Sequence, residues 1–133
     1  MTVKIQIERL PVTDGFIRRK RLIQQRGELA LIEDGRTFKH LGYFSIKKGE
    51  GLYRGGHYHL HKVEHFYVVS GRLLVRLVDL ETEEKSTVEL ETGCVAVLQP
   101  NCAHRFEALE EAQVIEYYDS IYDPADEHHY HNF

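Results

Sequence analysis

The chain has 133 residues, which fit one domain with a sizeable core, and we assign residues 1–133 to a single domain. Charged residues make up 29% of the chain and hydrophobic residues 42%, a mixture typical of globular proteins rather than of disordered or membrane-spanning ones. A formal net charge of −4 provides no broad basic surface, so we expect no nucleic-acid partner.

Strand-like segments dominate, because runs rich in Val, Ile, Tyr and Phe alternate with glycine and charged turns. In chain order the predicted strands span residues 4–7, 28–32, 40–46, 63–69, 73–79, 86–90, 95–98 and 112–118. Between them we predict a solvated basic turn at 18–21, turns at Ser70-Gly71 and Thr92-Gly93, a hairpin loop at 80–85, and an irregular surface tail from about 123. So many short strands at this spacing indicate an all-β protein with a closed or two-sheet architecture.

Neither a membrane-spanning segment nor a secretory leader is recognisable in the sequence. No stretch approaches the ~20 apolar residues that cross a bilayer, and the N-terminus has no apolar leader region. We therefore expect a cytoplasmic protein without a membrane partner. In a reducing compartment Cys94 and Cys102 are expected to be buried thiols rather than a disulfide.

A cluster of histidines lies between residues 57 and 65, next to a carboxylate. Side chains two apart on a strand share a face, so His57 and His59 can point at one place inside a barrel. Glu64 has the wrong parity for the same continuous strand, so a turn near residues 60–62 must reset the register before it. His61 then falls in the turn and His65 on the opposite face, which makes both weaker candidate ligands.

A second segment supplies a further histidine. The strand from Gly93 is followed by a Pro-Asn turn, in which Asn101 tolerates positive φ, and then by His104. Imidazole and carboxylate groups bind zinc, iron, manganese and nickel, and such a set leaves positions open for water or substrate. A lone histidine is more often a core or surface residue, but four ligands at these spacings predict a divalent-metal site, with zinc favoured. The set is His57, His59, Glu64 and His104.

These residues resemble the two motifs of the cupin superfamily. The first, H-x-H-x(3,4)-E-x(6)-G, is met by His57, His59, Glu64 and Gly71. The second, G-x(5)-P-x-G-x(2)-H-x(3)-N, is met by Gly93 and His104 but departs from the pattern at Gln99, Asn101 and Ala108. The resemblance implies a double-stranded β-helix, or jelly-roll barrel, in which the same four residues bind the metal.

A narrower resemblance concerns the run Arg54-Gly55-Gly56-His57-Tyr58-His59. It is similar to the R-G-x-H element of small cupins that act on nucleotide-activated keto-sugars, the dTDP-4-dehydrorhamnose 3,5-epimerases and dTDP-sugar 3,4-ketoisomerases. Over about residues 27–130 the chain also resembles the C-terminal cupin domain of capsular polysaccharide proteins, a metal-containing C3 epimerase, including Tyr122-Asp123-Pro124. This implies a carbohydrate-derived substrate and a homodimer, for which residues 3–7 are the candidate strand to cover a partner's sheet edge.

We therefore expect an enzyme of the isomerase class that removes a proton beside a sugar ketone, a step that needs a base and a group to hold the enolate oxygen. The candidate base is His61 or an unligated His57, and Arg54 is expected to hold the diphosphate or the enolate. Of the adjacent Tyr117 and Tyr118, one must face inward as a candidate proton donor. An iron-dependent dioxygenase, a sugar isomerase that uses zinc and a non-catalytic sugar-binding cupin remain as alternatives.

Overall fold

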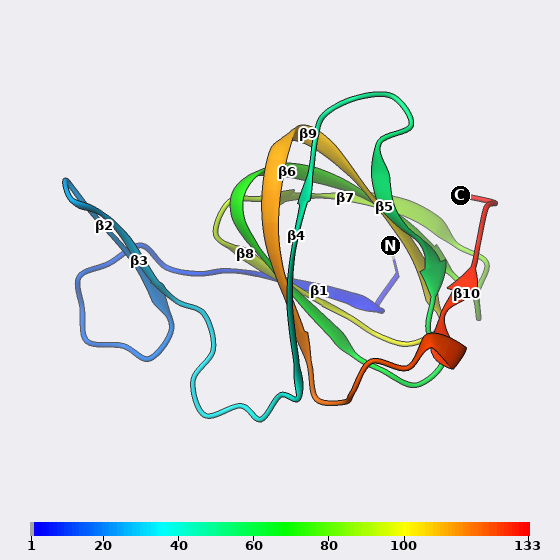
Figure 1. The fold of residues 1–133 in the computed structure, drawn as a ribbon, viewed down its shortest axis with the longest axis horizontal. Helices are drawn as coiled ribbons and strands as arrows, with labels where there is room; N and C mark the ends of the chain where they lie inside the picture. The colour runs from blue at the N-terminus through cyan, green and yellow to red at the C-terminus, as the bar shows by residue number, and fades with distance from the viewer. Residues whose placement is uncertain (1) are drawn as a thin grey trace.

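The computed structural model describes residues 2–133, and almost all of its regular structure is β-strand (Figure 1). The strands, in chain order, are β1 (Ile5–Arg9), β2 (Lys20–Gln24), β3 (Gly27–Leu31), β4 (His40–Ile46), β5 (Tyr53–Tyr58), β6 (Glu64–Asp79), β7 (Lys85–Glu91), β8 (Cys94–Leu98), β9 (Cys102–Tyr118) and β10 (His128–His129). A single 3-10 turn, η1 (Pro124–Asp126), precedes β10. Within the described part of the chain, no helix is long and apolar enough to cross a membrane.

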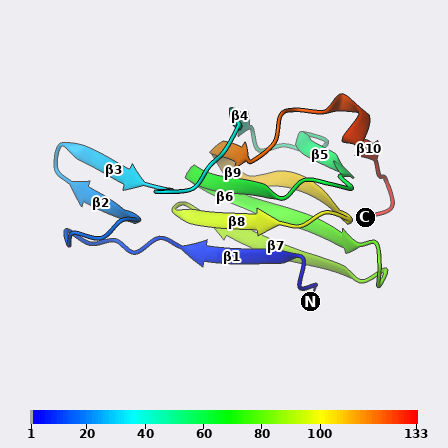
Figure 2. The same cartoon turned by 90° about the horizontal axis from the view of Figure 1, so that it is seen from below.

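Two long strands, β6 and β9, organise the barrel because each belongs to both of its sheets. The first half of β6 pairs with β8 and the last part of β9, whereas its second half pairs with β7 and the first part of β9. In turn, β9 pairs with β5 near its start and with β4 near its end. The result is two sheets, β1-β8-β6-β9-β4 and β7-β6-β9-β5-β10, folded over one core (Figure 2). The predicted all-β jelly roll is confirmed.

The core between the sheets is built from residues that alternate along the strands. Phe66 and Val68 of β6, and Ala112 and Val114 of β9, are buried in it. Glu64 shares the parity of Phe66 and Val68 and is also buried, at the point where β6 begins. The expected reset of register before Glu64 is therefore confirmed, and it carries a carboxylate into the barrel.

The turn predicted at Ser70-Gly71 is wrong, because β6 passes through it without a break. The pairing of β6 with β9 instead shifts register around Ser70, as in β-bulges. Gly71 has φ of +89°, and a Cβ there would collide with the carbonyl oxygen of Glu111. Glycine is required at this position by a close approach of two strands rather than by a reversal of the chain.

The predicted basic turn at 18–21 is also wrong in part, because Lys20 and Arg21 begin β2. Arg21 pairs with Glu28 across the β2–β3 hairpin, with Nε 2.8 Å from Oε2. The hairpin projects from the barrel (Figure 1, left) and leaves Ile23 and Leu29 more than half exposed. β1 pairs with β8 of its own chain on one side only, and the expectation that residues 3–7 cover a partner's edge stays a prediction.

The remaining differences concern strand lengths, the missed β5 and the C-terminal segment. The last predicted strand begins at Cys102 rather than at 112, and residues 53–58, with two glycines, form a strand that the sequence did not reveal. The expected irregular tail instead contains η1 and β10, and β10 pairs with β5. The hairpin loop after Asp79, the Thr92-Gly93 turn and the free, buried cysteines agree with expectation.

Candidate active site

A cavity of about 340 Å³ opens at one end of the barrel. Side chains from β4, β5, β6 and β9 line it, together with residues of the loops that follow β5 and β9. The polar and charged groups around it are His40, Arg54, His57, Lys62, Glu64, His104, Glu116, Tyr118, Tyr122 and Glu127. A concave site with convergent titratable groups is the usual form of an enzyme active site.

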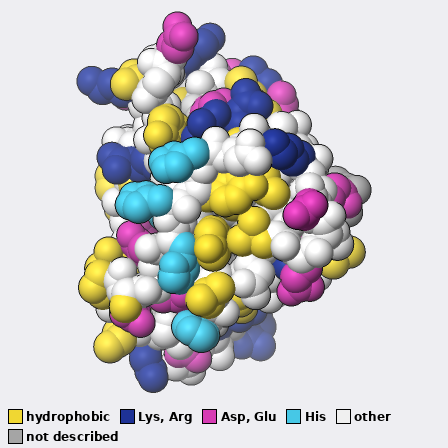
Figure 3. Space-filling view, turned by 90° about the vertical axis from the view of Figure 1, so that its right-hand side faces the viewer, with side chains coloured by type: hydrophobic (Ala, Val, Ile, Leu, Met, Phe, Trp, Pro, Cys, Tyr) yellow, Lys and Arg dark blue, Asp and Glu magenta, His cyan; other side chains and the backbone are white. Residues whose placement is uncertain are grey.

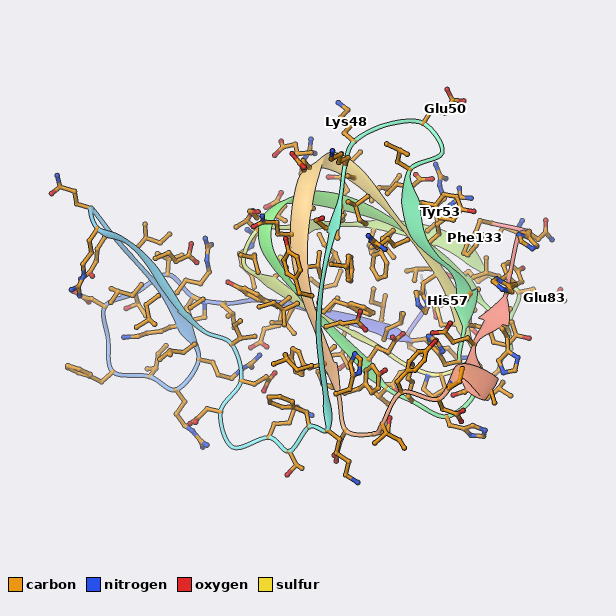
Figure 4. The ribbon with its side chains drawn as sticks, viewed as in Figure 1. Lys48, Glu50, Tyr53, His57, Glu83 and Phe133 are labelled. Carbon is orange, nitrogen blue, oxygen red and sulfur yellow. The ribbon has the colours of Figure 1, made fainter. Side chains whose placement is uncertain are left out.

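Gly55 lets β5 come close enough to β9 for their histidines to meet. His57 pairs with His104 across the two strands, just after a register shift between Gly55 and His57. Gly55 has φ of +85°, and a Cβ there would lie 2.8 Å from the carbonyl oxygen of His104. Figure 4 shows His57 at the end of β5, beside the C-terminal segment. Asn101, in the turn before His104, has φ of 60°, as its residue type predicted.

The structure brings the four predicted metal ligands together. His59 donates Nδ1–H to the carbonyl of Asp126 at 2.7 Å, and His104 donates Nδ1–H to the carbonyl of Cys102 at 3.0 Å. These bonds leave both Nε2 atoms as lone-pair donors, the tautomer that metal-binding histidines adopt. Glu64 Oε1 lies 3.1 Å from Nε2 of His59 and 3.4 Å from Nε2 of His104.

These three atoms are fully buried, and none has an aligned hydrogen-bond partner within the described structure. A buried polar atom without a hydrogen-bond partner costs free energy, unless a bound group that is not part of the protein chain contacts it. Ligands of a tetrahedral zinc ion lie roughly 3.3 Å apart, close to both spacings. One ring nitrogen each of His57, His59 and His104 also lies within 4.8 Å of the others. The residues therefore fit a divalent metal.

The electrostatics favour the metal-binding forms of His57, Glu64 and His104. At His59, burial opposes protonation, but the contact with Glu64 outweighs burial and raises the pKa. Burial lowers the pKa of His57 to about 3, and His104 and His59 add to the effect. Burial likewise lowers the pKa of His104, so both rings are neutral. Burial opposes ionisation of Glu64, but its contact with His59 outweighs burial and lowers the pKa of the carboxyl. Neutral imidazole beside a carboxylate is the combination that metal binding requires.

Two predicted catalytic residues lie outside the cavity. His61 is exposed in the loop after β5 and lines a separate, smaller cavity. Tyr117 faces the other side of β9, where its hydroxyl donates to Glu33 at 2.8 Å and its ring stacks on His65. Of the tyrosine pair, Tyr118 lines the cavity. Of the two candidate bases, His57 lines the cavity and His61 does not. Of the two candidate proton donors, Tyr118 lines the cavity and Tyr117 does not.

The cavity residues that were missed from the sequence include His40, Lys62 and Glu116. Lys62 Nζ lies 3.8 Å from Glu64 Oε2 and 4.2 Å from the centre of the Tyr118 ring. A signal for Glu116 was available, since Ala112 and Val114 face the core and strand alternation extends that face to residues 116 and 118. The same alternation places Tyr117 on the outer face of β9.

The C-terminal segment closes the site and holds one of its ligands. Asp126 is buried, and its carboxylate accepts backbone N–H bonds from Leu60 at 2.7 Å and His61 at 3.2 Å. The backbone carbonyl of Asp126 accepts the hydrogen bond from His59, and β10 pairs with Tyr58 and His57 of β5. Figure 3 looks onto this side of the molecule and shows histidine side chains gathered there. What was expected to be a tail is thus part of the support of the ligands.

We expect Asp126→Ala to weaken zinc binding by up to about 10- to 100-fold, because the carboxylate fixes the segment whose backbone carbonyl orients His59. Two backbone N–H groups would also lose a charged acceptor, which should lower stability by about 1–3 kcal/mol. Competition with a zinc chelator and thermal unfolding measure the two effects. Asp123→Ala is the matched control, because Asp123 only caps the exposed start of η1. Wild-type zinc affinity in Asp126→Ala would refute the positioning role.

Comparisons with known proteins agree with this description. The model of the polysaccharide biosynthesis C-terminal domain family matches residues 23–130. A search of curated proteins finds no match. The fold is that of solved 3,4-ketoisomerase and 3,5-epimerase structures, on which the barrel superimposes over nearly its whole length. By its family match, the chain belongs to the polysaccharide biosynthesis C-terminal domain family.

Three solved structures illustrate the likeness. The 3,4-ketoisomerase QdtA from Thermoanaerobacterium thermosaccharolyticum, a double mutant in complex with TDP, has 20% identity and a TM-score of 0.75, over 96% of this chain and 88% of that one. The TDP-quinovose 3,4-ketoisomerase WlaRB from Campylobacter jejuni has 16% identity and a TM-score of 0.72, over 96% and 93%. The dTDP-4-dehydrorhamnose 3,5-epimerase from Sulfolobus tokodaii has 22% identity and a TM-score of 0.69, over 94% and 81%. At these identities the likeness establishes the fold.

Proposed function

We propose that the protein is an isomerase or epimerase that acts on a nucleotide-activated keto-sugar by removing a proton beside the ketone. The observation that carries this proposal is the neutral imidazole of His57 in a cavity whose mouth holds Arg54. Arg54 donates Nε–H to the carbonyl of Ser45 at 3.0 Å and forms no ion pair with a carboxylate of residues 2–133. Its guanidinium is therefore available to a diphosphate.

The solved neighbours support this choice of substrate class. QdtA has been solved with TDP and, as a single mutant, with TDP-4-keto-6-deoxyglucose. A second neighbour, from Legionella pneumophila, is a 3,5-epimerase solved with dTDP-4-keto-L-rhamnose. Both reactions begin with loss of an acidic proton next to a carbonyl, which one base in one cavity can accomplish.

In this mechanism Arg54 anchors the diphosphate and His57 accepts the proton. The ammonium group of Lys62 lies beside Tyr118 and Glu64 in the same cavity, where it can stabilise an enolate oxygen. The residues that would hold a divalent metal, with zinc favoured, are His57, His59, Glu64 and His104. Such a metal would supply Lewis acidity toward the ketone oxygen. His57 cannot be ligand and base at once, so its two proposed roles exclude each other within a turnover.

The direct test is to incubate the purified protein with TDP-4-keto-6-deoxyglucose in D2O and follow the sugar by NMR. Deuterium entering beside the ketone, faster than in a protein-free control, is the expected result. Metal content is measured on the same sample. Oxygen consumption with bound iron would instead identify a dioxygenase, and TDP-sugar binding without exchange would identify a binding protein.

We expect Arg54→Lys to weaken TDP binding about tenfold, or about 1.4 kcal/mol, because lysine keeps the charge but loses the two-pronged contact. Metal content should stay at the wild-type level. Isothermal titration with TDP measures the first and elemental analysis the second. Arg26→Lys, in the exposed β2–β3 turn, is the matched control. Unchanged TDP affinity in Arg54→Lys would remove the argument for a nucleotide-linked substrate.

We further propose that the protein is a homodimer in which the β2–β3 hairpin packs on the second copy. Isolated two-stranded hairpins are marginally stable in water, yet this one projects with Ile23 54% and Leu29 51% exposed. Light scattering should give twice the mass of the chain, and replacing both residues with glutamate should give the single-chain mass. A monomeric wild type at working concentration would contradict the proposal.

A further inference from the structure

A second pair of titratable groups shares the cavity with His57 but takes no part in the metal site. His40 stands at the start of β4 and Glu116 near the end of β9, on strands that pair with each other. Nε2 of His40 lies 3.5 Å from Oε2 of Glu116. Both side chains line the cavity, and each is about one-quarter exposed.

The fold makes room for this pair with a glycine. Gly42 lies between the two side chains, where a Cβ would come within 3.0 Å of Glu116 Cγ and 3.1 Å of His40 Nε2. Gly42 does not have positive φ, so its backbone conformation does not call for glycine. The missing side chain is therefore explained by the space that His40 and Glu116 occupy.

The surroundings hold the pair in place and suit it to proton transfer. The His40 ring stacks on Tyr118, with centres 4.2 Å apart and planes 7° from parallel. Its Nε2 is buried, and among the described residues it has no aligned hydrogen-bond partner. Burial, reinforced by the charge of Glu64, raises the pKa of Glu116. A carboxyl with a raised pKa is better suited to donate a proton as a general acid than an ordinary carboxyl.

We propose that His40 and Glu116 form a second proton-transfer pair, which delivers the proton that completes the reaction begun by His57. The inference rests on the function proposed above. When His57 takes the proton, the C–H electrons form a carbon–carbon double bond and the ketone oxygen becomes an enolate. Glu116 then protonates the former ketone carbon, using the electrons of that double bond. The hydroxyl proton of the first carbon passes to the enolate oxygen, which leaves a ketone at the first carbon.

The two residues then return to their starting states through water. His57 releases its extra proton, and Glu116 regains one through His40, so the sum is an isomerised sugar with no other reactant. In this proposal Glu116 takes part only in the second half of the reaction, the protonation of the former ketone carbon. A residue with a merely structural role would instead affect proton removal and protonation together.

The test is Glu116→Gln, a change of nearly equal shape that removes the transferable proton. In D2O with TDP-4-keto-6-deoxyglucose, we expect product formation to fall by about 10²- to 10⁴-fold, the range for loss of a general acid. Recovered substrate should still gain deuterium beside the ketone at close to the wild-type rate, because His57 is untouched. Gly42→Ala, whose added methyl group displaces His40 or Glu116, should also lower product formation while keeping deuterium exchange, but to a smaller extent.

Glu111→Gln, an exposed carboxylate on the same strand, is the matched control and should behave as wild type. The inference is overturned if Glu116→Gln loses exchange and turnover together, or if its turnover is unchanged. A wild type that neither exchanges nor converts the sugar refutes the proposed function itself. A wild type that does both, without the split in the variant, refutes only the role of the pair.

Discussion

Purified Glu64→Gln protein should contain little or no metal, with zinc affinity at least about 100-fold below wild type. Loss of even an outer group that orients a ligand costs 10- to 100-fold, and Glu64 is itself a predicted ligand whose Oε1 lies close to both Nε2 atoms. A neutral amide is a poorer ligand than a carboxylate, and it cannot balance the charge of the cation. Elemental analysis of the purified protein and competition with a zinc chelator give the two numbers.

Glu110→Gln is the control for Glu64→Gln, because Glu110 is exposed and pairs only at long range with Arg72, at 3.7 Å. A circular dichroism spectrum of each variant checks that the barrel has formed. Wild-type metal content in a folded Glu64→Gln variant would show that the cluster is not a metal site. The unpaired atoms of His59 and His104 would then need another explanation.

The largest expected loss of activity is that of His57→Asn, about 10²- to 10⁴-fold in turnover if His57 is the general base. Because the base acts first, deuterium exchange beside the ketone should fall with turnover. TDP affinity should remain at the wild-type level, since the diphosphate is assigned to Arg54. NMR in D2O and isothermal titration with TDP measure these effects.

Metal content of His57→Asn separates the two roles of this residue. Retained metal with lost exchange would identify His57 as the base, with His59, Glu64 and His104 as three ligands, the number found in catalytic zinc sites. Loss of both metal and exchange would identify it as the fourth ligand. Retained exchange would contradict the proposed mechanism, because the neighbouring His104 is fully buried and already bonded to the carbonyl of Cys102.

Strand alternation predicted an all-β protein with a closed or two-sheet architecture, and ligand spacing predicted the four residues that the structure gathers. The jelly roll itself was implied by the resemblance to the cupins. Alternation is a local property, so β4 was predicted with its observed bounds. Glycine misled the prediction in two places, because it marks a close approach of strands as well as a turn. At Gly71 it allows a bulge in β6, and at Gly55 it allows β5 to meet His104.

Contacts between distant segments were beyond such reasoning. Nothing near Asp126 indicates that its carboxylate will accept N–H bonds from residues 60 and 61. His40 and Glu116 meet only because β4 and β9 pair, which no local pattern specifies. Tyr117 was a different error, since the parity of Ala112 and Val114 already assigned it to the outer face.

The pairing of β5 with β10 has a consequence for synthesis on the ribosome. Because translation proceeds from the N-terminus, β5 emerges long before the residues of β10 that cover its edge. During that interval the edge beside His57 is open, and unpaired strand edges are where nascent chains associate wrongly. The carbonyl that orients His59 arrives equally late. A metal bound by the proposed ligands would reach its final geometry only after residues 126–129 have left the ribosome, so slow synthesis of this segment would extend the period of risk.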